Sequence, residues 1–107
     1  MKRVGFQLKV RPEKVAEYIQ HHENVWEEML QALRESGWHN YSLFIRADGL
    51  LFGYFETEES LAAAQAKMAE RAVNTRWQEF MAPYFESPDN ARPDEMFLEL
   101  QEIFHLD

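Results

Sequence analysis

The fold is decided at the start of the chain by the stretch Arg3-Val4-Gly5-Phe6-Gln7-Leu8-Lys9-Val10-Arg11-Pro12. Apolar side chains occupy every second position from Val4 to Val10, which is the period of a β-strand with one buried face. Pro12 then lies in the first turn of a predicted helix, where its missing N–H costs no hydrogen bond. The sequence therefore opens with a strand that leads directly into a helix.

A single apolar stripe predicts one long helix over residues 15–33. Its members follow one another at spacings of three or four residues: Val15, Ile19, His22, Trp26, Met29 and Leu33. Ser36-Gly37 marks the end of this helix, because glycine readily adopts the left-handed conformation found there. From Trp38 the apolar period returns to two, which predicts a second strand.

A hairpin and two further helical segments follow. Asp48-Gly49 predicts a tight turn into a third strand over residues 50–57. A second helix is expected from about residue 59 to residue 72, with Asn74 or Thr75 capping a further helical piece. Apolar residues at alternate positions predict a last strand over residues 96–106.

The resulting order, βαββαβ, predicts an α+β chain with the ferredoxin-like split βαβ fold, as a single domain over residues 1–107. Two helices would cover one face of a four-stranded antiparallel sheet. The other face is expected to carry Phe44, Phe55, Phe97 and Ile103. Because an exposed apolar patch of this kind usually marks an interface, we expect a homodimer packed sheet against sheet. The natural ligand site is a pocket between the sheet and the long helix.

Composition excludes several classes of function. The chain has 107 residues, no cysteine and a formal charge of −8, which argues against a disulfide scaffold, a nucleic-acid partner and an anionic membrane partner. No run approaches 18 apolar residues, and the N-terminus lacks the apolar segment of a signal peptide. We therefore expect a cytoplasmic protein.

His22 is the sharpest candidate for chemistry, because it lies near the centre of the apolar stripe with Tyr18 one turn earlier. One interpretation is a buried histidine that is hydrogen-bonded by Tyr18 or a backbone carbonyl. The other is a general acid or base in a pocket, since histidine titrates near neutral pH.

Other chemistries lose support from the sequence. His21 and His22 diverge by about 100° on a helix, so they do not form a metal-binding pair, and we expect no metal. Neither a glycine-rich phosphate loop nor a nucleophile elbow occurs. The remaining inventory of one histidine, tyrosine hydroxyls and tryptophan rings suits a neutral polyol and proton transfer without a cofactor.

Taken together, the motifs closely resemble those of the L-rhamnose mutarotases, in order along essentially the whole chain. The matching residues are Lys2-Arg3, Gly5-Phe6, Val10, Pro12, Glu17-Tyr18, His22, Trp26, Glu28, His39-Asn40-Tyr41-Ser42, Leu50-Leu51-Phe52-Gly53, Arg76-Trp77, Met81, Pro88-Asp89-Asn90, Leu100, Glu102, Phe104 and Leu106. The specific part is the combination of Tyr18, His22 and Trp26 on one helix with His39-Asn40-Tyr41 at the next strand.

This resemblance implies a dimeric α+β barrel that interconverts the α and β anomers of L-rhamnopyranose or a related 6-deoxy sugar. It also implies that His22 is the proton donor, that Tyr18, Tyr41 and Trp77 line the sugar site, and that no cofactor is needed. Gln78 stands where the family often has a second tryptophan, so we assign Gln78 to the sugar site as an amide in place of a ring.

The implied mechanism is acid–base ring opening, in which His22 protonates the ring oxygen while another group or a water takes the proton of the anomeric hydroxyl. General acid–base catalysis of this kind typically contributes about 10²–10⁴-fold. Two alternatives remain at this point: a non-catalytic small-ligand-binding module of the same dimeric barrel, and a cofactor-free monooxygenase or isomerase, because one fold hosts many functions.

Overall fold

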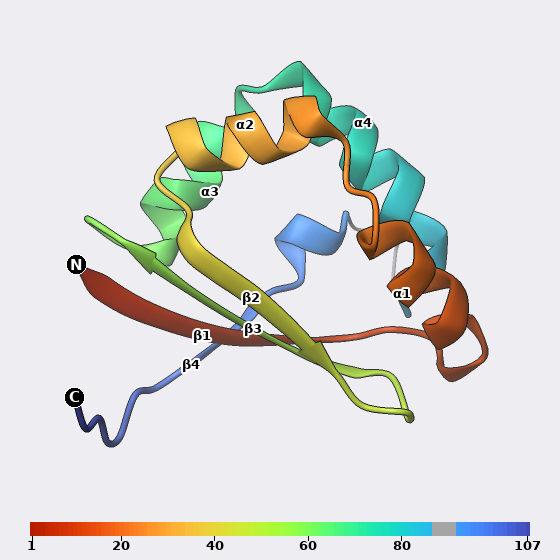
Figure 1. The fold of residues 1–107 in the computed structure, drawn as a ribbon, viewed down its shortest axis with the longest axis horizontal. Coiled ribbons are helices and arrows are strands. Elements are labelled where there is room, and N and C mark those ends of the chain that lie inside the picture. The colour runs from red at the N-terminus through yellow and green to blue at the C-terminus, as the bar shows by residue number, and fades with distance from the viewer. Residues whose placement is uncertain (87–91) are drawn as a thin grey trace.

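A computed structural model describes residues 1–86 and 92–107, and its elements follow the predicted order (Figure 1). The strands are β1 (Lys2–Lys9), β2 (His39–Ile45), β3 (Leu50–Thr57) and β4 (Leu98–Leu100). The α-helices are α1 (Val15–His22), α2 (Glu27–Glu35), α3 (Leu61–Ala69) and α4 (Ala72–Met81), with short 3-10 helices η1 (Pro12–Lys14), η2 (Ala82–Tyr84) and η4 (Pro93–Glu95). The sheet order is β2-β3-β1-β4 with antiparallel neighbours throughout, which confirms the ferredoxin-like α+β fold.

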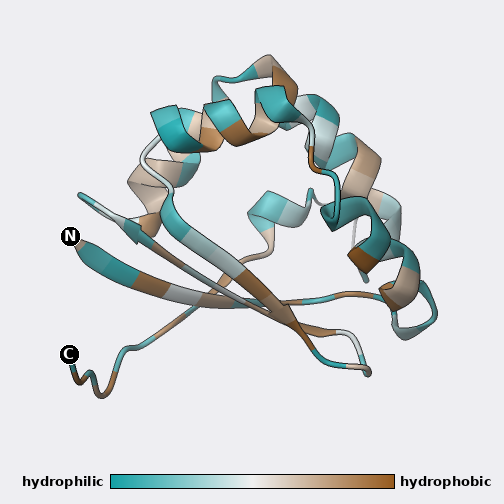
Figure 2. Ribbon diagram, in the orientation of Figure 1, coloured by the Kyte–Doolittle hydropathy of each residue, from teal (hydrophilic) through white to brown (hydrophobic). Residues whose placement is uncertain are grey.

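The helices arch over one face of the sheet, and the core fills the space between these two layers (Figure 1). The alternation of β1 is as expected: Val4, Phe6 and Leu8 are buried, and their neighbours face the other side. Figure 2 colours the ribbon by hydropathy and shows hydrophobic and hydrophilic residues interspersed along β1. Phe6 lies opposite Gly53 of β3, whose missing side chain leaves room for the Phe6 ring. The register of β1 against β3 is therefore fixed by a close ring-on-backbone contact as well as by hydrogen bonds.

The hairpin between β2 and β3 turns at Asp48-Gly49, as predicted. Gly49 has a φ of +97°, a conformation that side chains rarely adopt. The carboxylate of Asp48 accepts two hydrogen bonds from Arg46 and one from the backbone N–H of Leu50, which closes the turn. Turn chemistry read from the sequence thus gave the right strand pairing.

The prediction of one long helix over residues 15–33 was wrong, because the chain is helical only as α1 and α2. Between them Trp26 has extended backbone angles, and its carbonyl accepts from the N–H groups of Met29 and Leu30. Burial also departs from the predicted stripe, because Ile19 and Trp26 are exposed while Tyr18 is buried. Among the helices of the described segments, none is long and apolar enough to cross a membrane.

Two predicted boundaries in the second half of the chain were also wrong. Helix α4 begins at Ala72 after Arg71, so Asn74 lies inside its first turn, buried and turned inward, and neither Asn74 nor Thr75 is the cap. The last strand is confined to β4, because β1 pairs with it only through Gly5, Phe6 and Gln7. Beyond β4 the apolar side chains are exposed and make no strand.

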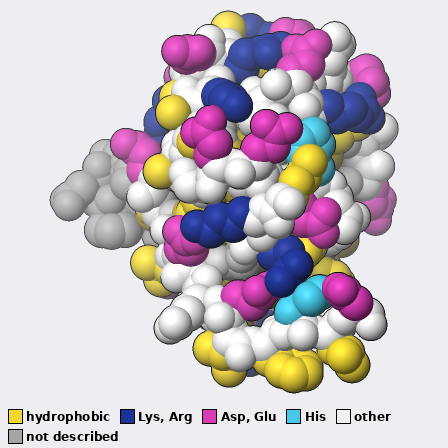
Figure 3. All heavy atoms as spheres, turned by 90° about the vertical axis from the view of Figure 1, so that its left-hand side faces the viewer, with side chains coloured by type: hydrophobic (Ala, Val, Ile, Leu, Met, Phe, Trp, Pro, Cys, Tyr) yellow, Lys and Arg dark blue, Asp and Glu magenta, His cyan; other side chains and the backbone are white. Residues whose placement is uncertain are grey.

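The outer face of the sheet is apolar, but not with all of the predicted residues. Phe55 and Phe97 face the helices instead, because Phe55 stacks on Trp38 and Phe97 stacks on Phe6, each with 4.0 Å between ring centroids. The exposed apolar side chains on the outer face and in the C-terminal segment are Phe44, Phe52, Leu98, Leu100, Ile103, Phe104 and Leu106. Figure 3 shows hydrophobic side chains gathered along the lower edge of the molecule in that view. We call Phe44, Phe52, Leu98 and Leu100 the outer apolar row.

Substitution of Gly53 by alanine is expected to destabilise the fold. The new Cβ would overlap carbon atoms of the Phe6 ring, which is fully buried and has no room to move. We expect Gly53→Ala to lower the free energy of unfolding in urea by about 1–3 kcal/mol, the usual effect of overpacking. Gly5→Ala is the matched control, because a Cβ there meets Phe52 at an ordinary 3.5 Å. Equal losses in both variants would contradict this account.

Candidate active site

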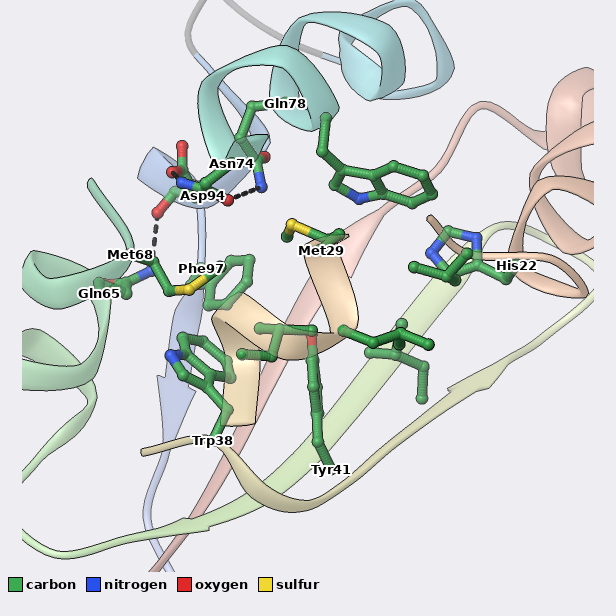
Figure 4. Close-up of a pocket in the computed structure, with 15 residues that line it drawn as sticks. His22, Met29, Trp38, Tyr41, Gln65, Met68, Asn74, Gln78, Asp94 and Phe97 are labelled. Carbon is green, nitrogen blue, oxygen red and sulfur yellow. Dashed lines mark hydrogen bonds between the residues drawn. The ribbon is translucent and has the colours of Figure 1, made fainter. Parts of the chain in front are cut away.

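A cavity of about 350 Å³ lies between the helices and the inner face of the sheet (Figure 4). This volume is within the range of small-molecule sites. Its apolar lining residues are Val25, Met29, Leu30, Leu33, Trp38, Leu43, Met68, Trp77 and Phe97, and its polar lining residues are His22, Tyr41, Gln65, Asn74, Gln78 and Asp94. An apolar cavity with a few convergent polar groups is the form expected for a ligand site.

His22 is the last residue of α1, and its ring packs between two aromatic side chains. The ring centroid lies 4.3 Å from that of Tyr18 and 5.6 Å from that of Trp77, whose ring it meets edge-on. Nδ1 of His22 lies 2.9 Å from the backbone carbonyl oxygen of Tyr18. Because a carbonyl only accepts, Nδ1 carries the hydrogen, and the neutral ring has a bare Nε2. That nitrogen has no hydrogen-bond partner among residues 1–86 and 92–107 and can exchange a proton with a ligand.

Burial lowers the pKa of His22 below the usual value for histidine. The hydrogen bond to the Tyr18 carbonyl acts in the opposite direction, and the nearby His21 lowers the pKa further. His22 is therefore neutral at neutral pH, so its bare Nε2 is ready to accept a proton and its imidazolium form is a comparatively strong acid.

Tyr18 and Tyr41 approach the cavity from different layers. Tyr18 lies one turn before His22 on α1, and Tyr41 points up from β2 (Figure 4). Tyr18 does not line the main cavity; it lines a smaller extension of about 60 Å³, which His22 and Tyr41 also line. Burial raises the pKa of both hydroxyls, so each stays a neutral phenol that can donate and accept hydrogen bonds but is no base.

Trp77 and Gln78 are consecutive residues of α4, and both reach the cavity. Trp77 is buried, and Gln78 is half-buried with its amide nitrogen 3.0 Å from Oδ1 of Asn74. The structure therefore places the five predicted site residues around one region, with Tyr18 in the extension. The matched segment Pro88-Asp89-Asn90 lies outside the described residues.

Sequence reasoning missed the polar wall formed by Gln65, Asn74 and Asp94. Asn74 and Gln78 are four residues apart, a spacing that puts two side chains on one helix face and could have identified the pair. Asp94 and Gln65 come from η4 and α3, and no local pattern links these segments to α4. Only the packing of three separate elements brings this wall together.

Removing the His22 ring is expected to change how stability depends on pH. In an unfolded chain histidine has a pKa near 6.5, whereas burial holds the folded pKa lower. Between these two values the unfolded state binds more protons, so stability falls as the pH falls through that window. Urea unfolding of wild type and His22→Asn from about pH 8 to about pH 5 should show a smaller loss in the variant. Parallel profiles would contradict the lowered pKa.

Comparison with known proteins identifies relatives along the full chain. The family model described as L-rhamnose mutarotase matches residues 3–106. The L-rhamnose mutarotase of Oceanobacillus iheyensis is 39% identical, and that of Bacillus subtilis is 37% identical, over 100% of each chain in both cases.

Solved structures agree with this match. The crystal structure of L-rhamnose mutarotase from Formosa agariphila has a TM-score of 0.80 with 26% identity and covers 100% of both chains. A putative antibiotic biosynthesis monooxygenase from Nitrosomonas europaea, with a TM-score of 0.60 and 17% identity, shares the fold alone. The comparisons do not favour a monooxygenase or a non-catalytic module. The chain belongs to the L-rhamnose mutarotase family and is a sugar mutarotase, an isomerase that interconverts the anomers of a carbohydrate.

Proposed function

We propose that this enzyme interconverts the α and β anomers of L-rhamnopyranose, with His22 as the proton donor. The observation that carries the proposal is the fixed tautomer of His22: Nδ1 is held by the Tyr18 carbonyl, which leaves Nε2 for the substrate. The names of the relatives support the choice of sugar.

Ring opening moves one proton and breaks one bond. The anomeric hydroxyl loses its proton, the ring oxygen gains one, and the C1–O5 bond breaks to give an open-chain aldehyde. Because both oxygens are attached to C1, a single Nε2 placed between them can take the proton of the first and give it to the second. Rotation about C1–C2 and closure by the reverse steps then give the other anomer.

The lowered pKa of His22 and the raised pKa values of the two tyrosines support His22 as the group that moves the proton. Burial keeps His22 neutral before the reaction, so Nε2 can accept the first proton. Tyr18 and Tyr41 keep their hydroxyl protons, which suits them to hold sugar hydroxyls. Trp77 would cover the C–H face of the sugar, and Gln78 would supply an amide. The proposal needs no metal or organic cofactor.

We also propose a homodimer in which two sheets pack through the outer apolar row to form the dimeric barrel. The row has members on β2, β3 and β4, and Gln7 lies between them on β1, since Phe44 pairs with Phe52, Phe52 with Gln7, and Gln7 with Leu98. A two-fold axis would let the same surface serve both subunits. A cytoplasmic location, expected from the sequence, is part of the proposal.

Replacement of His22 should abolish catalysis. We expect His22→Asn to slow anomer exchange of L-rhamnose by about 10²–10⁴-fold, the usual contribution of a general acid–base group. The rate is measured by saturation-transfer NMR between the two anomeric proton signals.

His21→Asn is the matched control, because His21 bonds the Tyr84 hydroxyl at 2.8 Å and does not line the cavity. This variant should exchange the anomers at about the wild-type rate. Wild-type protein that binds the sugar, seen by tryptophan fluorescence, without speeding exchange would overturn the proposed function. An active His22→Asn variant would overturn only the role of His22.

A charge in the outer apolar row should separate the subunits. Phe44 is 62% exposed in the single chain, and Phe44→Lys would bury an unpaired ammonium group at the interface. Sedimentation velocity should show a dimer for wild type and a monomer for Phe44→Lys. Phe80→Lys, at an apolar site 40% exposed on α4, should stay dimeric. A monomeric wild type would refute the interface.

A further inference from the structure

The polar side chains of the cavity are divided between two ends. His22 lies at one end, and Gln78, Asn74, Asp94 and Gln65 gather at the other (Figure 4). The proton-transfer steps above use only the His22 end. The opposite end is built by three different elements and joined by hydrogen bonds, so its function requires its own explanation.

A chain of hydrogen bonds at this end has a fixed direction. The Arg92 guanidinium binds both carboxylate oxygens of Asp94, with Nε 3.2 Å from Oδ1 and a terminal nitrogen 2.9 Å from Oδ2. A carboxylate paired in this way only accepts hydrogen bonds. The neighbour of Asp94 is Asn74, whose buried amide must therefore present its nitrogen to Asp94, at 3.3 Å.

The orientation of the Asn74 amide in turn determines the orientation of the Gln78 amide. Since the Asn74 nitrogen faces Asp94, Oδ1 of Asn74 faces Gln78 and accepts from its amide nitrogen at 3.0 Å. The orientation of an amide is normally ambiguous, but here the acceptor-only carboxylate determines it. Gln78 lines the cavity, and no residue in the described segments donates a hydrogen bond to its Oε1.

We propose that Oε1 of Gln78 accepts a hydrogen bond from a substrate hydroxyl, which makes Gln78 a specificity-determining residue. Asn74 and Asp94 are positioning residues that hold the amide in this orientation. The inference rests on the proposed function, because it takes the substrate to be a pyranose whose C1 and ring oxygen lie at His22. Across a six-membered ring from these atoms lie C3 and C4, so the bound group is the 3-hydroxyl or the 4-hydroxyl.

The test uses sugars in which one hydroxyl is replaced by fluorine, which is similar in size but cannot donate. The ratio of kcat/KM for L-rhamnose to kcat/KM for its 3-deoxy-3-fluoro and 4-deoxy-4-fluoro analogues is measured by saturation-transfer NMR. Fluorine also changes the reactivity of C1, but this effect is the same in every variant. Comparison between variants therefore isolates the contact with Gln78.

For one of the two analogues, the ratio should be about three- to tenfold larger in wild type than in Gln78→Met, as expected for one neutral hydrogen bond. Gln31→Met, the same change at an exposed position of α2, should behave as wild type. Identical ratios in wild type and Gln78→Met for both analogues would overturn the inference even if L-rhamnose exchange is fast. A wild type inactive on L-rhamnose would refute the proposed function, and the inference would fail with it.

The positioning role is tested at the other two residues. Asn74→Leu removes the acceptor that orients Gln78, so it should reduce the ratio toward that of Gln78→Met. Asp94→Asn keeps the size of the side chain but can donate as well as accept, so it no longer imposes a direction and should also reduce the ratio. The ratio, unlike total activity, is insensitive to a general loss of folded protein. Wild-type ratios in the folded forms of these variants would overturn the positioning role.

Discussion

The contact between the Phe6 ring and the backbone of Gly53 is the constraint on which the rest of the structure depends. Phe6 is fully buried, stacks on Phe97 and lies 6.3 Å, between ring centroids, from Tyr41. The same ring therefore fixes the register of β1 on β3, holds the segment before β4 against the core, and supports Tyr41 from below. A side chain at position 53 would displace the Phe6 ring and, with it, the floor of the site.

Because the predicted helix is interrupted between α1 and α2, residues of this segment line the candidate site. A continuous helix would have kept His22 within an unbroken apolar stripe with Ile19 and Trp26. Because α1 ends at His22, Val25 lies outside the helix and lines the cavity, while Trp26 is exposed. The ring of His22 is thus enclosed by Tyr18 and Trp77 on two sides and open to the cavity on another. The hydrogen bond from Nδ1 to a backbone carbonyl agrees with the first interpretation of His22, and its role as a general acid or base remains a prediction.

Local sequence patterns predicted the first three strands and the hairpin, because side-chain alternation and turn chemistry act within a few residues. These patterns failed where contacts between residues far apart in the sequence determine the structure. The apolar spacing continues across the break after His22, so periodicity alone does not show it. Phe55 and Phe97 face inward because Trp38 and Phe6 stack on them. The same holds for the candidate site. Pattern and resemblance predicted His22, Tyr18, Tyr41, Trp77 and Gln78, whereas Asp94 reaches the cavity only through tertiary packing.

His22 at one end of the cavity needs surroundings without a carboxylate, whereas the other end contains the charged Asp94. The distance between the two ends keeps this charge away from His22. A carboxylate close to His22 would raise its pKa and keep the ring protonated, which would remove the bare Nε2. In a chain with a net charge of −8, burial, the Tyr18 carbonyl and His21 shift the pKa of His22, and no carboxylate of residues 1–86 and 92–107 does so. Asp94 lies at the far end and is paired with Arg92, so its charge is used to orient Asn74. Burial is then the largest influence on the pKa of His22, and a hydroxyl-rich substrate can still find polar partners in the same cavity.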